Sequence, residues 1–214
     1  MTLLQILAAL GMVLLLTMVV KHIDWSHLCS SKKQQHLVFG ATASLFILWI
    51  FRAGIYEGLY VHFLWLSALA LLLGLRWSML VATAALVAVT ALGYERWEML
   101  GVNGLLGVTV PLLLTHLFFS VSFHRLPRNL FVYIFVCAFF PGALVIATKM
   151  ALLGGYYVLE GTYDWLTVKD NFIVLIPLML FPEGMLNGMT MTLLIIYKPD
   201  WVYTFHDKFY IDGK

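Results

Sequence analysis

Long apolar runs alternate along the chain with short polar stretches that contain most of the charged residues. The hydrocarbon core of a bilayer is about 30 Å thick, and about 20 apolar residues cross it as a helix. The pattern predicts an all-α, polytopic membrane protein. It has about seven transmembrane helices, at residues 2–20, 37–51, 60–75, 77–93, 100–123, 129–153 and 171–197.

We expect residues 1–197 to form a single transmembrane domain and residues 198–214 to form a cytoplasmic tail. The tail mixes charged residues with aromatic ones, namely Trp201, Tyr203, Phe205, Phe209 and Tyr210. This composition is typical of a segment that lies at the lipid headgroups. It equally suits a segment that docks a cytoplasmic partner.

The basic residues predict the orientation of the helices. With the N-terminus outside, nine basic residues fall in cytoplasmic segments and three, Arg52, Arg96 and Lys169, fall in outer ones. The nine are Lys21, Lys32, Lys33, Arg76, Arg125, Arg128, Lys198, Lys208 and Lys214. Cytoplasmic loops of membrane proteins carry an excess of Lys and Arg. The sequence therefore predicts an outer N-terminus and a cytoplasmic C-terminus.

The amino-acid composition further restricts the class of protein. The chain is 62% hydrophobic and 11% charged, whereas soluble domains carry about 25% charged residues. A net charge of only +2, with its basic residues in loops, argues against a nucleic-acid partner. Cys29 and Cys137 form no CxxC motif, so no disulfide framework or zinc site is indicated. We interpret residues 2–20 as a retained helix and not as a signal peptide, because no basic region precedes them.

The last apolar run contains a carboxylate, Glu183, and an amide, Asn187, which share one helix face at a spacing of four residues. An acid inside a membrane helix costs about 2.5–3.5 kcal/mol and normally faces protein or a water-filled cavity. Gly184 and Gly188 form a GxxxG motif that lets another helix approach closely. Pro177 and Pro182 are able to kink the helix. Two interpretations stay open, a packed helix whose Glu is satisfied by hydrogen bonds, and a functional site or moving element.

Four other polar residues lie in or beside apolar runs: His62, Asn103, His116 and Lys149. His62 and Asn103 are candidates for substrate or metal binding, with a structural hydrogen bond as the alternative, whereas His116 and Lys149 are candidates for a structural or coupling role. His116 is typical of an interhelical hydrogen bond, and Asn103 needs a partner. Lys149 either reaches outward to the membrane surface or pairs with an acid, Glu183 being one candidate.

Other chemistries are weakly indicated. The spacing of His22, His27, Cys29 and His36 does not favour a metal site, and the methionines near Glu183 are more typical of packing than of a copper site. The HExxH motif of membrane metalloproteases is absent, and no Ser or Cys has an obvious base, so we expect no enzyme. His62 and His116 lack the pairing that a haem carrier needs.

Three blocks of the chain resemble the CbiM/NikM permeases, the cobalt- or nickel-capturing components of energy-coupling factor transporters. The blocks are residues 60–77 (YVHFLWLSALALLLGLRW), 100–107 (LGVNGLLG) and 176–188 (IPLMLFPEGMLNG). The resemblance implies a multi-pass protein of the bacterial cytoplasmic membrane that binds a divalent transition metal, nickel, cobalt or another, from outside. It also implies a transmembrane coupling subunit and cytoplasmic ATPases as partners. It assigns His62 as a metal ligand, Asn103 as the amide behind the site, and Glu183 as the acid of the last helix. Asn187, on the same helix face as Glu183, is a further candidate for substrate or metal binding.

The chain also departs from that family. It begins Met1-Thr-Leu and has no His at position 2, so the Met-His hook that supplies most of the family's metal ligands is missing. Leu106 stands where the family has a second Asn, and Asn187 stands where it has Thr. Two functions therefore compete. One is the substrate-binding component of an importer, with a metal as cargo, and the other is a non-transport membrane subunit that docks in a larger complex.

Overall fold

The computed structural model describes residues 1–206, which form helices joined by turns and one long extended loop. The helices are α1 (Leu3–Lys21), α2 (Trp25–Ser30), α3 (Lys32–Ile50), α4 (Leu66–Leu73), α5 (Leu75–Ala91), α6 (Leu100–Val102), α7 (Val110–Arg125), α8 (Leu130–Val132), α9 (Phe140–Leu159), α10 (Trp165–Asn171) and α11 (Ile176–Tyr197). Residues 207–214 of the predicted tail, with Lys208, Phe209, Tyr210 and Lys214, lie outside the described residues.

The structure of residues 1–206 confirms the predicted all-helical architecture. In the described part of the chain, four helices are long and apolar enough to cross a membrane, and they are Leu3–Lys21, Trp97–Arg125, Leu130–Leu159 and Trp165–Tyr197. Helix α5 is apolar but shorter. The predicted helix at residues 60–75 is wrong, because the chain is extended up to Trp65 and α4 has only 8 residues, about 12 Å. The number of seven spans and the orientation stay predictions.

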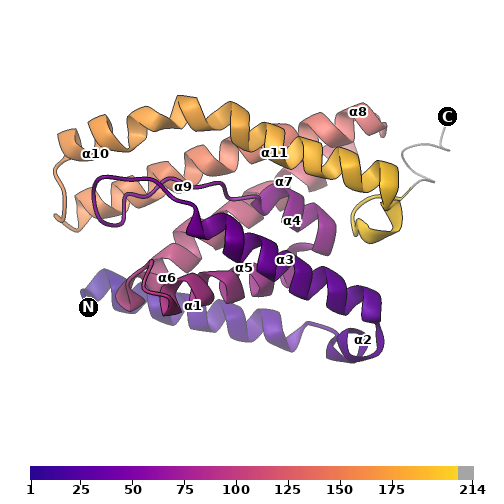
Figure 1. Ribbon diagram of the computed structural model, residues 1–214, viewed down its shortest axis with the longest axis horizontal. Coiled ribbons are helices and arrows are strands. Elements are labelled where there is room, and N and C mark those ends of the chain that lie inside the picture. The colour runs from indigo at the N-terminus through magenta and orange to yellow at the C-terminus, as the bar shows by residue number, and fades with distance from the viewer. Residues whose placement is uncertain (207–214) are drawn as a thin grey trace.

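The helices form two groups with α4 between them. In Figure 1, α1, α3 and α5 lie on one side of the molecule, and α9 and α11 lie on the other. Helix α4 packs against α5, α7, α9 and α11, and all of its residues are buried. A short helix is thus enclosed at the centre of the bundle.

Prolines shape the two longest helices of the middle region. Turns of π-helix, Asn103–Thr109 and Tyr133–Phe139, lie just before Pro111 and Pro141. A proline ring clashes with the carbonyl four residues earlier, and a wider turn relieves this clash. In the last span, Pro177 stands at the start of α11 and only Pro182 lies inside it.

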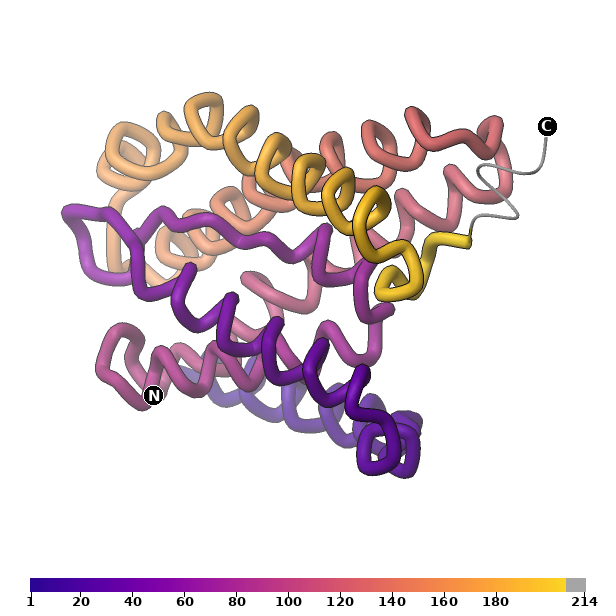
Figure 2. The backbone as a smooth tube through the Cα atoms, turned by 45° about the vertical axis from the view of Figure 1, so that its right-hand side comes forward, coloured from indigo at the N-terminus to yellow at the C-terminus, as the bar shows by residue number. Residues whose placement is uncertain are grey.

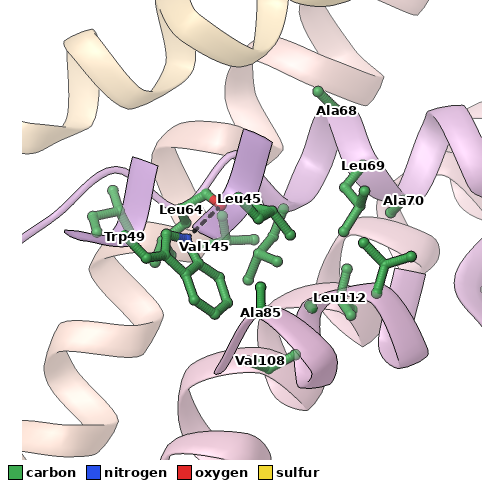
Figure 3. Close-up of a cluster of buried hydrophobic side chains, with 14 of the residues drawn as sticks. Leu45, Trp49, Leu64, Ala68, Leu69, Ala70, Ala85, Val108, Leu112 and Val145 are labelled. Carbon is green, nitrogen blue, oxygen red and sulfur yellow. Dashed lines mark hydrogen bonds between the residues drawn. The ribbon is translucent and has the colours of Figure 1, made fainter. Parts of the chain in front are cut away.

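Apolar side chains from distant segments fill the centre. Figure 3 shows part of this core, where Leu45 and Trp49 of α3 meet Leu64 of the extended loop and Leu69 of α4. The outer surface is apolar too. Helix α1 exposes a row of large apolar side chains, which include Leu3, Leu7, Leu10 and Leu14. Apolar residues on both sides of a helix are expected where one side faces lipid.

Helix α11 packs closely on the π-helical turn before α9. A Cβ atom at Gly184 would lie 2.9 Å from the Phe139 carbonyl oxygen, and one at Gly188 would lie 3.4 Å from the Phe139 Cβ. Both glycines of the GxxxG motif therefore face Phe139, and Gly184 lies closer to it than Gly188 does.

The segment after α11 packs on the C-terminus of α4. The Tyr203 N–H donates to the Leu72 carbonyl at 3.0 Å, and the Thr204 N–H donates to the Leu71 carbonyl at 3.2 Å. The last carbonyls of a helix lack partners within it. Up to residue 206, the predicted tail therefore binds the chain's own central helix.

Candidate functional site

The N-terminus of α4 is held by two polar side chains of α11. The Glu183 carboxylate accepts hydrogen bonds from the backbone N–H groups of Leu64 and Trp65, both at 2.8 Å. The side-chain oxygen of Asn187 accepts one from the Ala68 N–H at 2.8 Å. The first N–H groups of a helix have no partner inside it, so Asn187 satisfies one of them at Ala68, while Glu183 binds the amides of the two residues that precede α4.

The two capping side chains also bind each other. Asn187 Nδ2 donates to the backbone carbonyl and to Oε1 of Glu183, both at 2.8 Å, and both residues are 0% exposed. The positive end of the α4 dipole favours a carboxylate at this place. The acid predicted to face protein thus has its charge met by three donors, two backbone amides and the Asn187 amide.

The loop of residues 51–65 is fixed at its base and at its end. Ala53 and Val61 exchange backbone hydrogen bonds of 2.8 and 2.9 Å, which join the two arms of the loop. The Leu64 carbonyl accepts from Trp49 Nε1 at 3.3 Å (Figure 3). Trp65 then takes a left-handed backbone conformation, with φ 56°, before α4 begins. Figure 2 shows this segment running back across the middle of the molecule.

His62 is carried on this loop and is 8% exposed. Its Nδ1 lies 3.0 Å from the Phe63 carbonyl oxygen, and its Nε2 lies 2.6 Å from Nζ of Lys149. A carbonyl only accepts and an ammonium only donates. The two contacts therefore assign the proton of the neutral imidazole to Nδ1 and leave the lone pair on Nε2.

The buried side chains of His62 and Lys149 line a small cavity of about 30 Å³ with Arg52, Glu95 and Asn103. One water needs about 10–15 Å³ of such space, so the cavity has room for about two waters or one ion. Arg52 forms an ion pair with Glu95, and both side chains are largely buried. Asn103 Nδ2 donates to the other carboxylate oxygen of Glu95 at 3.1 Å.

The structure brings together only some of the candidate residues. His62, Lys149 and Asn103 share the cavity, whereas Glu183 and Asn187 act at the end of the loop that carries His62. Lys149 does not form an ion pair with Glu183, the candidate partner considered from the sequence, because within residues 1–206 no acid lies within ion-pair distance of Lys149.

His116 lies apart from the cavity, on an exposed side of α7. Its side chain makes no hydrogen bond to any described residue, so the expected interhelical bond is not formed. The methionines near Glu183 do not gather either. Met185 and Met189 are 43% and 54% exposed, and Met191 is fully buried. Through residue 206, no three His, Cys, Asp or Glu side chains come close enough to hold a metal ion.

Sequence reasoning missed Arg52 and Glu95, which were counted only as charges of the outer loops. They lie 43 positions apart, so no local spacing joins them. The available signal was their position, since each lies within two residues of the end of an apolar run and beside an aromatic residue. Arg52 stacks near the rings of Tyr60 and Tyr94.

Comparisons with known proteins agree on the fold. Residues 2–201 match the model of the CbiM family, described as the cobalt uptake substrate-specific transmembrane region. A crystal structure described as a truncated transition metal transporter superposes with a TM-score of 0.70 and 18% identity, over 90% of this chain and 92% of that one. At this identity the likeness shows the fold alone. Comparison with curated proteins gives no match.

Proposed function

This chain belongs to the CbiM family of metal-uptake membrane components, and we propose that it is the substrate-binding subunit of a transition-metal importer. The importer is of the energy-coupling factor type, in which cytoplasmic ATPases act through a transmembrane coupling subunit. The distribution of basic residues supports an outer N-terminus and a cytoplasmic C-terminus in a bacterial cytoplasmic membrane.

The observation that carries the proposal is the orientation of His62. Its Nδ1–H donates to the Phe63 carbonyl, and its Nε2 lone pair faces Lys149 Nζ, a neighbour that lines the same cavity. Histidines that bind metals usually donate their other ring N–H to a carbonyl or carboxylate, which fixes the ring and its tautomer. Imidazole suits nickel, cobalt and zinc among the first-row metals. His62 is thus prepared as a ligand for such an ion.

The remaining polar residues support this role by position. Glu183 and Asn187 hold the end of the loop that carries His62, and Asn103 fixes the Glu95 carboxylate beside the cavity. Carboxylate and amide oxygens are weaker partners for nickel and cobalt than imidazole is. We therefore assign metal binding to His62 and positioning to the other four residues.

The test compares two histidine variants. Wild-type protein, His62→Ala and His116→Ala are purified in mild detergent without chelator, and nickel, cobalt and zinc are measured by elemental analysis. We expect His62→Ala to lose most of the bound metal and His116→Ala to keep it, because His116 lies on an exposed helix side away from the cavity. Equal metal content in wild type and His62→Ala would remove His62 as a ligand.

One observation favours a second function, that of a membrane subunit that transports nothing. In the described residues, no group of three metal-binding side chains surrounds the cavity. If this function is correct, none of the three proteins contains or binds metal, and other membrane proteins co-purify in fixed proportion with the wild type.

A further inference from the structure

The Nε2 lone pair of His62 already has a partner. Lys149 of α9 is 6% exposed, and its Nζ lies 2.6 Å from His62 Nε2. The ammonium group only donates hydrogen bonds, so one of its protons points at the nitrogen lone pair. A metal ion bound by His62 would use the same lone pair, and one lone pair serves one partner.

The charges and the size of the cavity prevent a metal ion and the Lys149 ammonium group from occupying it together. Arg52 is a second cation at the cavity wall, and its charge is already met by the Glu95 carboxylate. The cavity of about 30 Å³ holds an ion only if little else enters it. A divalent ion beside an ammonium group in a buried space meets strong repulsion, because the low dielectric screens it little.

The Lys149 side chain packs against a glycine on its way to this contact. Gly107 of the π-helical turn lies against the Lys149 stem, where a Cβ would come within 3.7 Å of the lysine Cε. The carboxylates of Glu95 and Glu183 attract the ammonium charge and help to offset its burial. The lysine is thus held in the cavity by packing, by charge and by the imidazole.

We infer that Lys149 is a tethered cation that occupies the metal position on His62, so that metal binds only when the lysine side chain withdraws. The inference rests on the proposed function and adds a regulatory element to the same site. The apparent affinity for metal is then the intrinsic affinity multiplied by the fraction of molecules whose site is free. Return of the ammonium to His62 would favour release of the metal.

The test removes the charge with side chains that are only one atom shorter than lysine. Wild type, Lys149→Met and Lys149→Gln are titrated in detergent with NiCl₂ and with CoCl₂ by isothermal titration calorimetry. Lys169→Met is the matched control, because Lys169 is an exposed lysine of α10 that does not line the cavity. If the free-site fraction of the wild type is about 10% or less, both Lys149 variants bind metal at least about tenfold more tightly. Lys169→Met binds as the wild type does.

A double variant shows whether the gained affinity belongs to the same site. Adding His62→Ala to Lys149→Met is expected to abolish the tighter binding, and a Co²⁺ absorption spectrum reports the loss of the imidazole ligand. Elution as a single species in detergent shows that each variant folds. If one of the two Lys149 variants does not fold, the other one carries the test.

Three results would overturn the inference. If wild type and both Lys149 variants bind metal equally and through His62, Lys149 is no competitor and the proposed function stands. If the Lys149 variants lose the binding that the wild type has, the lysine assists metal binding, and again only the inference fails. If no variant binds metal, with or without Lys149, both the inference and the proposed function fail.

Discussion

Replacing Glu183 by Gln tests whether the carboxylate holds the loop of His62. One carboxylate oxygen accepts from the Leu64 N–H, and the other accepts from the Trp65 N–H and from Asn187 Nδ2. A glutamine amide offers one acceptor and one donor. In its better orientation the new NH₂ faces the Leu64 N–H, which loses its partner.

The expected cost follows from these contacts. A buried donor left without an acceptor costs about 1–3 kcal/mol. The lost attraction between a charge and the N-terminus of α4 adds about 0.3–1 kcal/mol. Relief of the burial of a full charge offsets part of this. We expect Glu183→Gln to lower the free energy of unfolding by about 2 kcal/mol.

The assay uses the cysteines of the chain. Cys137 is 1% exposed and Cys29 is exposed, so a Cys29→Ser background leaves a buried thiol that reacts with a fluorescent maleimide only on unfolding. Unfolding in mixed detergent micelles is followed by this reaction. Hydrogen exchange at the Leu64 and Trp65 amides measures the loop directly, and we expect faster exchange at both.

Thr190→Val is the control. Its hydroxyl accepts from Trp65 Nε1 at 2.9 Å, so this variant loses a neutral hydrogen bond from the same helix to the same residue while the backbone amides keep their acceptor. We expect a cost of about 1 kcal/mol and no change in exchange at Leu64. The reasoning is refuted if Glu183→Gln costs no more than Thr190→Val and leaves exchange at both amides unchanged.

Two further predictions use the same unfolding assay. Gly184→Ala brings a methyl group within 2.9 Å of the Phe139 carbonyl oxygen and is expected to destabilise the protein by about 1–3 kcal/mol. Gly188→Ala places its methyl group 3.4 Å from the Phe139 side chain and is expected to cost clearly less. Equal costs of the two variants would contradict the close contact at Gly184. Glu95→Gln leaves the largely buried Arg52 without its ion pair and is expected to cost about 3 kcal/mol. The exposed pair of Glu57 with Arg96 is the control, and Glu57→Gln is expected to cost about 0–1 kcal/mol; similar losses in both would show that burial of the Arg52 pair contributes nothing.

The sequence predicted well where the information is local. The spacing of Glu183 and Asn187 indicated a shared helix face, and both side chains point to the same end of α4. Their partners were beyond prediction, because the amides of Leu64 and Ala68 lie 119 positions away. Backbone amides also leave no mark in the sequence, since every residue except proline carries one.

The error at residues 60–75 has a physical cause. Hydropathy measures how apolar a segment is and not whether its backbone is helical. An extended segment at membrane depth is possible only where other groups satisfy its N–H and C=O groups. Here Ala53, Trp49 and Glu183 do so for the backbone of Val61, Leu64 and Trp65, which lets a loop of apolar residues stand where a helix was expected.

Helix α4 connects the candidate site to the last helix of the chain. An isolated helix of 8 residues is unstable, so tertiary contacts must fix α4. Its N-terminus is bound by Glu183 and Asn187 from within α11, and its C-terminus is bound by Tyr203 and Thr204, which lie in the segment after α11. Both ends of α4 therefore depend on one segment of chain. His62 lies four residues before α4, on the loop that Glu183 holds, so its position is set from α11 as well. Lys149 reaches His62 from α9, the helix against which α11 packs. A shift of α11 relative to α9 would change the His62–Lys149 distance, and under the proposed competition this distance decides whether the lone pair of His62 is free for a metal.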